Sequence, residues 1–226
     1  MDHFFTDAFA ASKDTEALYK AMFMSCASEE AAKVRQQYYK TQFRAMGENV
    51  EIGVNVKIVN PQYISVGSDV RICDNVTLIA RGKGGIAIGD GVTLNDRVYL
   101  DTEREDDGYI TIANDVYIGT GTTLFGHVGL EIGANALLAQ NITITPYSHI
   151  FEDPEQLIIE QGGHTRKVVI GRDSYLGMHV CVLYSADIGE GSVVGSGSVV
   201  VKTLLPYSVA VGNPAKVIRQ RKGTGT

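Results

Sequence analysis

The 226-residue sequence predicts a mainly β fold, a parallel β-helix of about seven coils. Three observations support this prediction. Aliphatic residues recur every six positions from Ile52 to Val200, a period that fits better than that of an α-helix or of simple strand alternation. The first 47 residues differ in composition from the rest and favour helix. The six-residue pattern also stops after His149 and restarts at Ile170, which predicts one long loop.

The N-terminal segment, residues 1–47, is rich in Ala, Lys, Glu, Gln and Met and has no glycine before Gly47. We expect a short helix that begins at Asp14 or the next residue. A second helix is expected after Ser28, whose side chain can cap it ahead of two glutamates in the first turn. Gly47 is expected to end this second helix. We interpret the segment as a helical cap over the open end of a solenoid.

Twenty hexads follow, and each begins with Ile, Leu or Val. The second residue of a hexad is often Gly, where the backbone must turn or approach a neighbour closely. The fifth residue is usually small or β-branched. We expect three hexads to form one triangular coil, with the first residues stacked coil upon coil into a continuous core. The hexads begin at residues 52, 58, 66, 72, 78, 88, 94, 100, 112, 118, 124, 132, 138, 144, 170, 176, 182, 188, 194 and 200.

Breaks in the pattern all follow a third hexad, so the insertions should gather along one edge of the prism. Long loops on a rigid scaffold are where function is concentrated. The longest insertion begins directly after His149, which predicts that His149 is a corner residue beside the loop. The chain is thereby divided into a helical segment 1–47, a β-helix 48–205 with a protruding loop 150–169, and a C-terminal tail 206–226.

Composition argues against several classes of partner. The formal charge of −6 is unsuited to a nucleic-acid surface, and only the tail from Lys216 to Lys222 is distinctly basic. The N-terminus lacks the features of a signal peptide, and no apolar run of about 18 residues predicts a membrane span. Three widely spaced cysteines without a CxxC motif are expected to be reduced thiols in a cytoplasmic protein.

The ladder, the loop and the ending together resemble the hexapeptide-repeat acyltransferases, most closely the sugar and polysaccharide O-acetyltransferases such as the maltose and galactoside enzymes. The similarity covers about residues 48–219. It implies a left-handed parallel β-helix, a homotrimer with active sites between subunits, and acetyl-CoA in the groove between neighbouring columns. Hexads alone also occur in nucleotidyltransferases, succinyltransferases and γ-type carbonic anhydrases. The resemblance is carried by residues 132–135, 145–149, 169–173, 195–200, Lys202, Pro206 and 212–218.

In that family a histidine at the end of the third hexad, just before the loop, is the catalytic base, and His149 occupies this place. As a base it would take the proton of a substrate hydroxyl while that oxygen attacks the thioester. A solvated corner histidine is the alternative. His127, one coil earlier, could orient the base or hold the acceptor, or be a surface residue. Tyr147 above it and His164 in the loop are candidate substrate-binding residues, although His164 could simply be solvated.

Cofactor binding is implied only by position in the family pattern. The backbone N–H groups of Gly177 and Met178 would face the thioester and support an oxyanion. A corner one coil later would bond the pantetheine amides, and basic residues would meet the CoA phosphates unless they form only a solubilising tail. These further residues are Ser196, Gly197, Lys202, Lys216 and Arg219.

The acceptor is open at this stage. A hydroxyl of a sugar, nucleotide sugar or glycan precursor is favoured, and an amino sugar or an antibiotic is an alternative. Several histidines on one edge also raise the possibility of a zinc enzyme of the γ-carbonic anhydrase kind, but their spacing differs from that pattern and no metal is expected. A non-catalytic scaffold is the third possibility. Since no Cys or Ser is placed as a nucleophile beside His149, we expect direct transfer.

Overall fold

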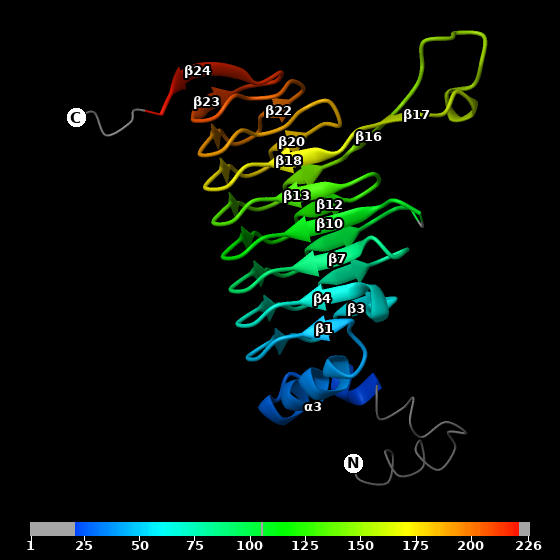
Figure 1. Ribbon diagram of the computed structural model, residues 1–226, viewed down its shortest axis with the longest axis vertical. Helices are drawn as coiled ribbons and strands as arrows, with labels where there is room; N and C mark the ends of the chain where they lie inside the picture. Colours follow the sequence, from blue (N-terminus) through cyan, green and yellow to red (C-terminus); the bar gives the residue numbers. More distant parts are fainter. Residues whose placement is uncertain (1–20, 105, 222–226) are drawn as a thin grey trace, which may run out of the picture.

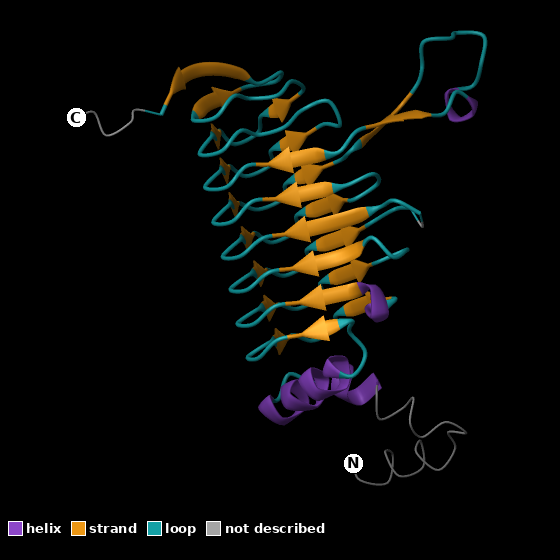
Figure 2. Ribbon diagram, in the orientation of Figure 1, coloured by secondary structure: helices purple, strands orange, loops and turns teal. Residues whose placement is uncertain are grey.

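The computed structural model describes residues 21–104 and 106–221. Most of them form a tall column of short parallel strands, wound as a solenoid with helix α3 (Glu29–Lys40) at its N-terminal end (Figure 1). One loop projects from the column near the other end (Figure 2). The predicted fold class, a mainly β left-handed parallel β-helix, is confirmed.

Three sheets make the faces of the column, and the chain visits them in a fixed order, A, then B, then C. Sheet A has six strands, sheet B nine and sheet C seven. Sheet A contains β1 (Ala45–Met46), β4 (Ile64–Val66), β7 (Gly85–Ile88), β10 (Tyr109–Ile112), β13 (Leu130–Ile132) and β18 (Val168–Ile170).

Sheets B and C are built from strands of two or three residues, except for β23 and β24 at the end of sheet B. Sheet B contains β2 (Glu51–Ile52), β5 (Arg71–Ile72), β8 (Thr93–Leu94), β11 (Tyr117–Ile118), β14 (Leu137–Leu138), β19 (Tyr175–Leu176), β21 (Val193–Val194), β23 (Ser208–Val211) and β24 (Lys216–Gln220). Sheet C contains β3 (Lys57–Val59), β6 (Thr77–Ile79), β9 (Tyr99–Asp101), β12 (Thr123–Phe125), β15 (Thr143–Ile144), β20 (Cys181–Val182) and β22 (Val199–Val200).

The first residues of the hexads stack in register from coil to coil. In sheet B, for example, Ile118 of β11 pairs with Leu94 on one side and Leu138 on the other. All of the twenty first positions are buried except Ile58, which is half-buried in the first coil. The predicted continuous aliphatic core is therefore confirmed, and it holds the column together by removing apolar side chains from water.

The helix α3 (Glu29–Lys40) covers the N-terminal end of the column. The hydroxyl of Ser28 caps it by accepting a hydrogen bond from the backbone N–H of Ala31, as the sequence predicts. Arg35 fixes the helix to the column, because its buried guanidinium donates to the carbonyl of Ile52 at 2.8 Å. The helix expected from Asp14 begins outside the described residues.

The prediction that Gly47 ends this helix is wrong. The helix ends at Lys40 with Thr41 as its C-cap, and Met46 in β1 already pairs with Val66 of β4. Met46 thus begins the first hexad of the first coil, which the search for Ile, Leu and Val missed. Gly47 follows it as a second-position glycine, where a Cβ would lie 2.4 Å from the Ser68 hydroxyl.

Insertions gather at the corner where the chain passes from sheet C to sheet A, which we call the insertion edge. It carries the short helix η1 (Pro61–Tyr63) and the turns that follow β6, β9 and β12. It also carries the long loop, whose root is a hairpin of β16 (Tyr147–His149) and β17 (Gly163–Thr165) and whose outer part contains η2 (Ile158–Glu160). The corner from sheet B to sheet C, called the B–C edge, has only tight turns.

Candidate functional site

His149 lies at the root of the long loop, as the last residue of β16. It pairs with Gly163 of β17 in an antiparallel register, so the backbone on both sides of it is held in the hairpin. Its side chain is exposed. Within the described part of the chain, Nε2 of the imidazole has no hydrogen-bond partner, and this nitrogen is therefore accessible to a substrate.

Tyr147 lies between His127 and His149 on the insertion edge. Its ring stacks on His127 with centroids 4.9 Å apart and planes at 11°, while its edge meets His149 at a centroid distance of 4.9 Å. The Tyr147 hydroxyl lies 3.1 Å from Nδ1 of His149. The predicted stacking of Tyr147 above His127 is confirmed. His127 therefore adjoins Tyr147, and Tyr147 is the residue that contacts His149.

His127 is kept neutral by its surroundings. Burial lowers the pKa of this imidazole, and the nearby positive charge of Arg104 lowers it further, against a smaller opposing effect of Asp101. Its Nδ1 is buried without a hydrogen-bond partner among the described residues. The ring of His127 also makes an edge-to-face contact with Phe125, at a centroid distance of 6.1 Å.

Ion pairs hold the root of the long loop against the column, whereas its tip projects away from the column. Arg166 forms an ion pair with Asp187, and Lys167 pairs with Glu131 at 2.9 Å. The lysine and a hydrogen bond from Tyr109 hold the pKa of the Glu131 carboxyl below its ordinary value. These contacts fix the second leg of the loop, so the hairpin that carries His149 has a rigid support.

His164 lies on β17, opposite Ser148 of β16. Its exposed ring stacks on Tyr184 of the next coil at a centroid distance of 6.0 Å. It is therefore beside the hairpin residues of the site, at the root of the loop, where it remains a candidate for contact with an acceptor.

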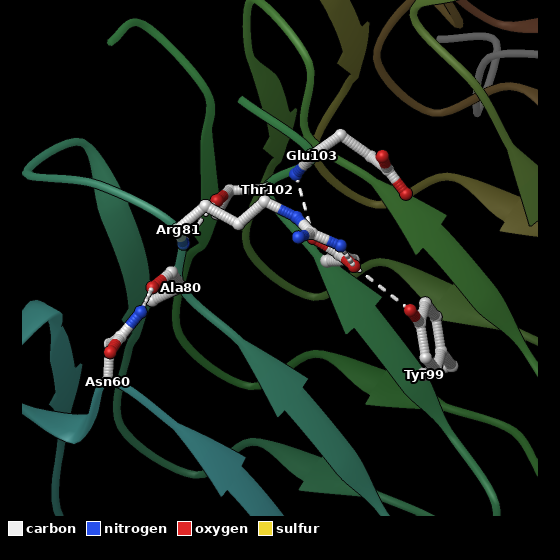
Figure 3. A network of polar contacts seen from close by, with 7 residues as sticks. Asn60, Ala80, Arg81, Tyr99, Thr102 and Glu103 are labelled. Atoms are coloured by element: carbon white, nitrogen blue, oxygen red, sulfur yellow. Dashed lines mark hydrogen bonds and ion pairs between the residues drawn. The ribbon is translucent and has the colours of Figure 1, made fainter. Parts of the chain in front are cut away.

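A polar network below these residues was not foreseen from the sequence (Figure 3). Asp101 is fully buried, and its carboxylate accepts two hydrogen bonds from Arg81, one from the Tyr99 hydroxyl and one from the backbone N–H of Glu103. Burial, together with the hydrogen bond to the Asp101 carboxylate, raises the pKa of Tyr99 to about 12. The network stiffens the insertion edge beneath His127.

The signal for this network was a spacing across coils. Arg81 and Asp101 are 20 residues apart, and both lie in third hexads of successive coils. The rung partner of Asp101 is Ile79, two residues before Arg81, so a search for opposite charges within two positions of the equivalent residue one coil away would have found the pair.

The residues predicted to face the thioester lie on the B–C edge. Met178 is exposed, and its carbonyl accepts a hydrogen bond from Gly197 of the next coil at 2.8 Å. Gly177 cannot supply a free N–H, because that group donates to the carbonyl of Val194 within the ladder. The expectation that the Gly177 N–H supports an oxyanion is therefore wrong, because this group is already hydrogen-bonded. Ser196 stacks directly on Gly177, and its side chain is exposed.

The basic residues do not form one cluster in a single chain. Lys202 lies on the insertion edge, two coils beyond the loop root. Lys216 and Arg219 lie on β24, which pairs with β23 at the end of sheet B. All three side chains are exposed, and none takes part in an ion pair of the described residues.

The candidate residues are thus divided between two edges of the column. His149, Tyr147 and His127 lie on the insertion edge, whereas Met178 and Ser196 lie on the B–C edge. One hexad of extended chain, at most about 20 Å, separates the edges. A cavity of about 560 Å³ lies at neither, but between α3 and the first strands of sheet B.

Among residues 21–104 and 106–221, no group of three His, Cys, Asp or Glu side chains is arranged to hold a metal ion. In the same residues, no helix has the length and apolar character needed to cross a membrane.

Comparisons with known proteins agree with this architecture. No protein-family profile matches the chain. A protein of Mycobacterium tuberculosis named a probable acetyltransferase is 34% identical over 137 residues, which are 61% of this chain and 45% of that protein. The galactoside O-acetyltransferase of Escherichia coli is 32% identical over 113 residues, 49% of this chain and 54% of the enzyme. The chain spans about half the length of these two relatives.

A solved structure covers more of the chain. The N-acyltransferase AntD of Bacillus cereus, in complex with dTDP and coenzyme A, superposes with a TM-score of 0.60 and 26% identity over 83% of this chain and 89% of that one. The solenoid column and these relatives make the chain similar to the hexapeptide-repeat acyltransferases. The resemblance of this chain to that class is confirmed.

Proposed function

We propose that this protein is a CoA-dependent acyltransferase that moves an acetyl group from acetyl-CoA to a hydroxyl of a sugar, nucleotide sugar or glycan precursor. One observation carries the proposal. His149 is held through Nδ1 at the root of the loop, and its Nε2 is exposed and unpartnered in the described part of the chain. A positioned neutral imidazole with one free nitrogen is suited to general-base catalysis.

The chemistry follows from this geometry. Nε2 of His149 accepts the proton of the acceptor hydroxyl while that oxygen attacks the thioester carbonyl of acetyl-CoA. The C–O bond forms and the carbonyl becomes a tetrahedral oxyanion. When the oxyanion collapses, the C–S bond breaks, and the imidazolium returns its proton to the departing thiolate. The products are the acetyl ester and free CoA, and His149 is again neutral.

The cofactor would lie along the B–C edge, where Met178 and Ser196 are exposed one above the other. Lys216 and Arg219 on β24 would attract the phosphates of CoA, with Lys202 on the insertion edge contributing from the other side. Since Gly177 donates its N–H within the ladder, support for the oxyanion would come from the N–H of Met178. No metal enters this reaction scheme.

A second copy of the chain is needed to assemble such a site. The base and the cofactor residues lie on different edges of one column, so an insertion edge must face the B–C edge of a neighbour. Heterologous contacts of this kind close into rings. A homotrimer is therefore part of the proposal, as is the division into a helical segment 1–47, a β-helix 48–205 and a tail 206–226. Free cysteines fit a cytoplasmic location.

Two relatives support different acceptors. The galactoside enzyme supports transfer to a sugar hydroxyl, and the segment it shares covers 49% of this chain. AntD is an N-acyltransferase, and one of its structures contains an amino sugar linked to dTDP. Transfer to the amine of a nucleotide amino sugar is therefore the second candidate function. Polysaccharide precursor synthesis is the process that both candidates would serve.

The test is release of CoA thiol from acetyl-CoA with separate panels of simple sugars, nucleotide sugars, amino sugars and aminated antibiotics. The proposal expects turnover with at least one hydroxyl acceptor and a product whose acetyl group is removed by mild base, as an ester is. A base-stable product would indicate the amide of the second candidate. No turnover with any panel, together with no binding of CoA by calorimetry, would favour a scaffold and refute the enzyme.

A further inference from the structure

Tyr147 contacts both His127 and His149, and each contact constrains it differently. The face of its ring rests on His127, with planes only 11° apart. Its edge meets the ring of His149 at 89°, and its hydroxyl reaches Nδ1 at 3.1 Å. The stacking fixes the ring, and the fixed ring sets where the hydroxyl lies. Its hydroxyl has no other hydrogen bond within the described residues.

The direction of this hydrogen bond decides what His149 can do. A neutral imidazole carries one proton, on Nδ1 or on Nε2. If the tyrosine donates to Nδ1, the proton of His149 sits on Nε2, and the exposed nitrogen cannot accept another. If Nδ1–H donates to the tyrosine oxygen, Nε2 keeps its lone pair and can act as a base. Only the second arrangement is compatible with the accessible nitrogen as the base.

We propose that Tyr147 is the positioning residue that sets the tautomer of His149, with its hydroxyl oxygen accepting a hydrogen bond from Nδ1–H. No carboxylate or backbone carbonyl bonds to the His149 ring among the described residues, so the tyrosine is the partner that the structure offers. In serine proteases a buried aspartate has this role, and the wrong tautomer there costs about 10⁴ in rate. The direction of this hydrogen bond rests on the proposed function, because only a base at Nε2 requires this tautomer, but the tautomer can be measured without turnover.

The same hydrogen bond gains strength during the reaction. Once Nε2 has taken the acceptor proton, the ring is an imidazolium and the Nδ1–H bond to the tyrosine becomes charge-assisted. The hydrogen of the Tyr147 hydroxyl is then directed away from His149, and it is available to an oxygen of the acceptor. Tyr147 would thus serve both as positioning residue and as the substrate contact expected from its place in the sequence.

Tyr147→Phe removes only the hydroxyl and preserves the ring that stacks on His127. Tyr184→Phe is a matched control, because Tyr184 also stacks on a histidine of the same edge, His164, with planes at 11°. The tautomer is read from ¹⁵N chemical shifts of protein with labelled histidines, and His149→Gln identifies the His149 signals by their loss. This measurement needs neither acceptor nor turnover.

The proposal expects the Nδ1–H tautomer at His149 in the wild type and in Tyr184→Phe, and loss of its dominance in Tyr147→Phe. With acetyl-CoA and an active acceptor, kcat of Tyr147→Phe should fall at least about tenfold while the KM for acetyl-CoA is unchanged. An Nε2–H tautomer in the wild type, or the same tautomer and kcat in Tyr147→Phe, would overturn it. If no acceptor is turned over but the tautomer changes as expected, the positioning role stands and the proposed function fails.

Discussion

Two histidines on the insertion edge have different surroundings. His149 is the proposed base, whereas the surroundings of His127 disfavour its protonated form. His149 is exposed and bonded at one nitrogen, whereas His127 is half-buried beneath Tyr147 and holds an unpartnered Nδ1. The lowered pKa of His127 keeps it neutral, so it adds no positive charge beside the imidazolium that forms on His149.

His127 should make the protein sensitive to acid. Because its pKa in the folded state is lower than in the unfolded chain, the unfolded state binds more protons as pH falls below about 6.5. The associated stability is present above that pH and is lost as pH falls toward the folded-state pKa. His127→Phe, which keeps a ring beneath Tyr147, should lose less Tm than the wild type between pH 7.5 and pH 5. Equal losses in thermal melts would contradict this explanation.

Asp101 should contribute far more to stability than a surface acid. Its carboxylate is fully buried and accepts four hydrogen bonds, so Asp101→Ala should cost about 3 kcal/mol in urea unfolding. Glu51→Ala is the control, because its pair with Arg71 is 60–69% exposed and should be worth less than about 1 kcal/mol. Similar costs for both variants would mean that the network of Figure 3 does not stiffen the edge.

At the scale of the hexad, two positions of the backbone have different constraints. Second-position glycines allow one coil to lie close to the next; a Cβ on Gly133 would be 2.5 Å from the backbone nitrogen of Arg172. Fourth positions instead adopt the left-handed region, as Asn135 and Asn141 do at φ of 61° and 56°. His179 occupies one of these turns at φ 59°, which gives a structural reason for its place.

Gly133→Ala tests the close approach. The contact is with backbone atoms that cannot move aside cheaply, so the substitution should cost about 2 kcal/mol or more. Gly162→Ala is the matched control, since no atom lies within 4 Å of the new Cβ and only the φ of +79° is unfavourable. Its cost should stay near 1 kcal/mol. Chemical unfolding of both variants would show equal costs if coil-to-coil approach were unimportant.

The sequence was sufficient for the elements with a regular period. The aliphatic first positions, the insertion edge and the cap by Ser28 were all predicted, because burial and capping leave local patterns. The start of the first coil was missed, since Met46 replaces the expected Ile, Leu or Val. The end of α3 was misplaced for the same reason: the glycine after Met46 belongs to a hexad.

The candidate site was harder to predict than the fold. Position alone brought His149, Tyr147 and His127 together, because equal hexad positions stack. Side-chain direction did not follow from position, so the Tyr147 hydroxyl bond to His149 was not foreseen. The hydrogen bond from the Gly177 N–H to the Val194 carbonyl could not be predicted either. Backbone N–H groups of this kind bond between coils throughout the column, and the sequence does not show which of them remain free.

At the scale of the whole molecule, the tip of the loop leaves apolar surface uncovered. Leu157, Ile158 and Ile159 are 67%, 54% and 81% exposed, on a segment that projects from the column (Figure 1). Within the described part of the chain these three side chains are left uncovered, and such patches mark interaction sites. In the proposed trimer we expect this tip to pack on a neighbouring copy.

Ile159→Asp should therefore weaken the trimer, because it places a charge in an interface. Analytical ultracentrifugation is expected to show trimers of the wild type and a shift toward monomers in the variant at the same concentration. Val34→Asp, an exposed apolar residue of α3 at the opposite end, is the control and should remain trimeric. A wild-type protein that is monomeric at all concentrations would contradict the two-edge site.

The central claim is that His149 is the base for acetyl transfer, and the most direct measurement is kcat/KM for acetyl-CoA thiol release in His149→Ala with an active acceptor. We expect a loss of at least about 100-fold, with CoA binding and Tm close to the wild type. Arg71→Gln, at the far end of sheet B, should retain full activity. Near-wild-type transfer by a folded His149→Ala protein would contradict the account.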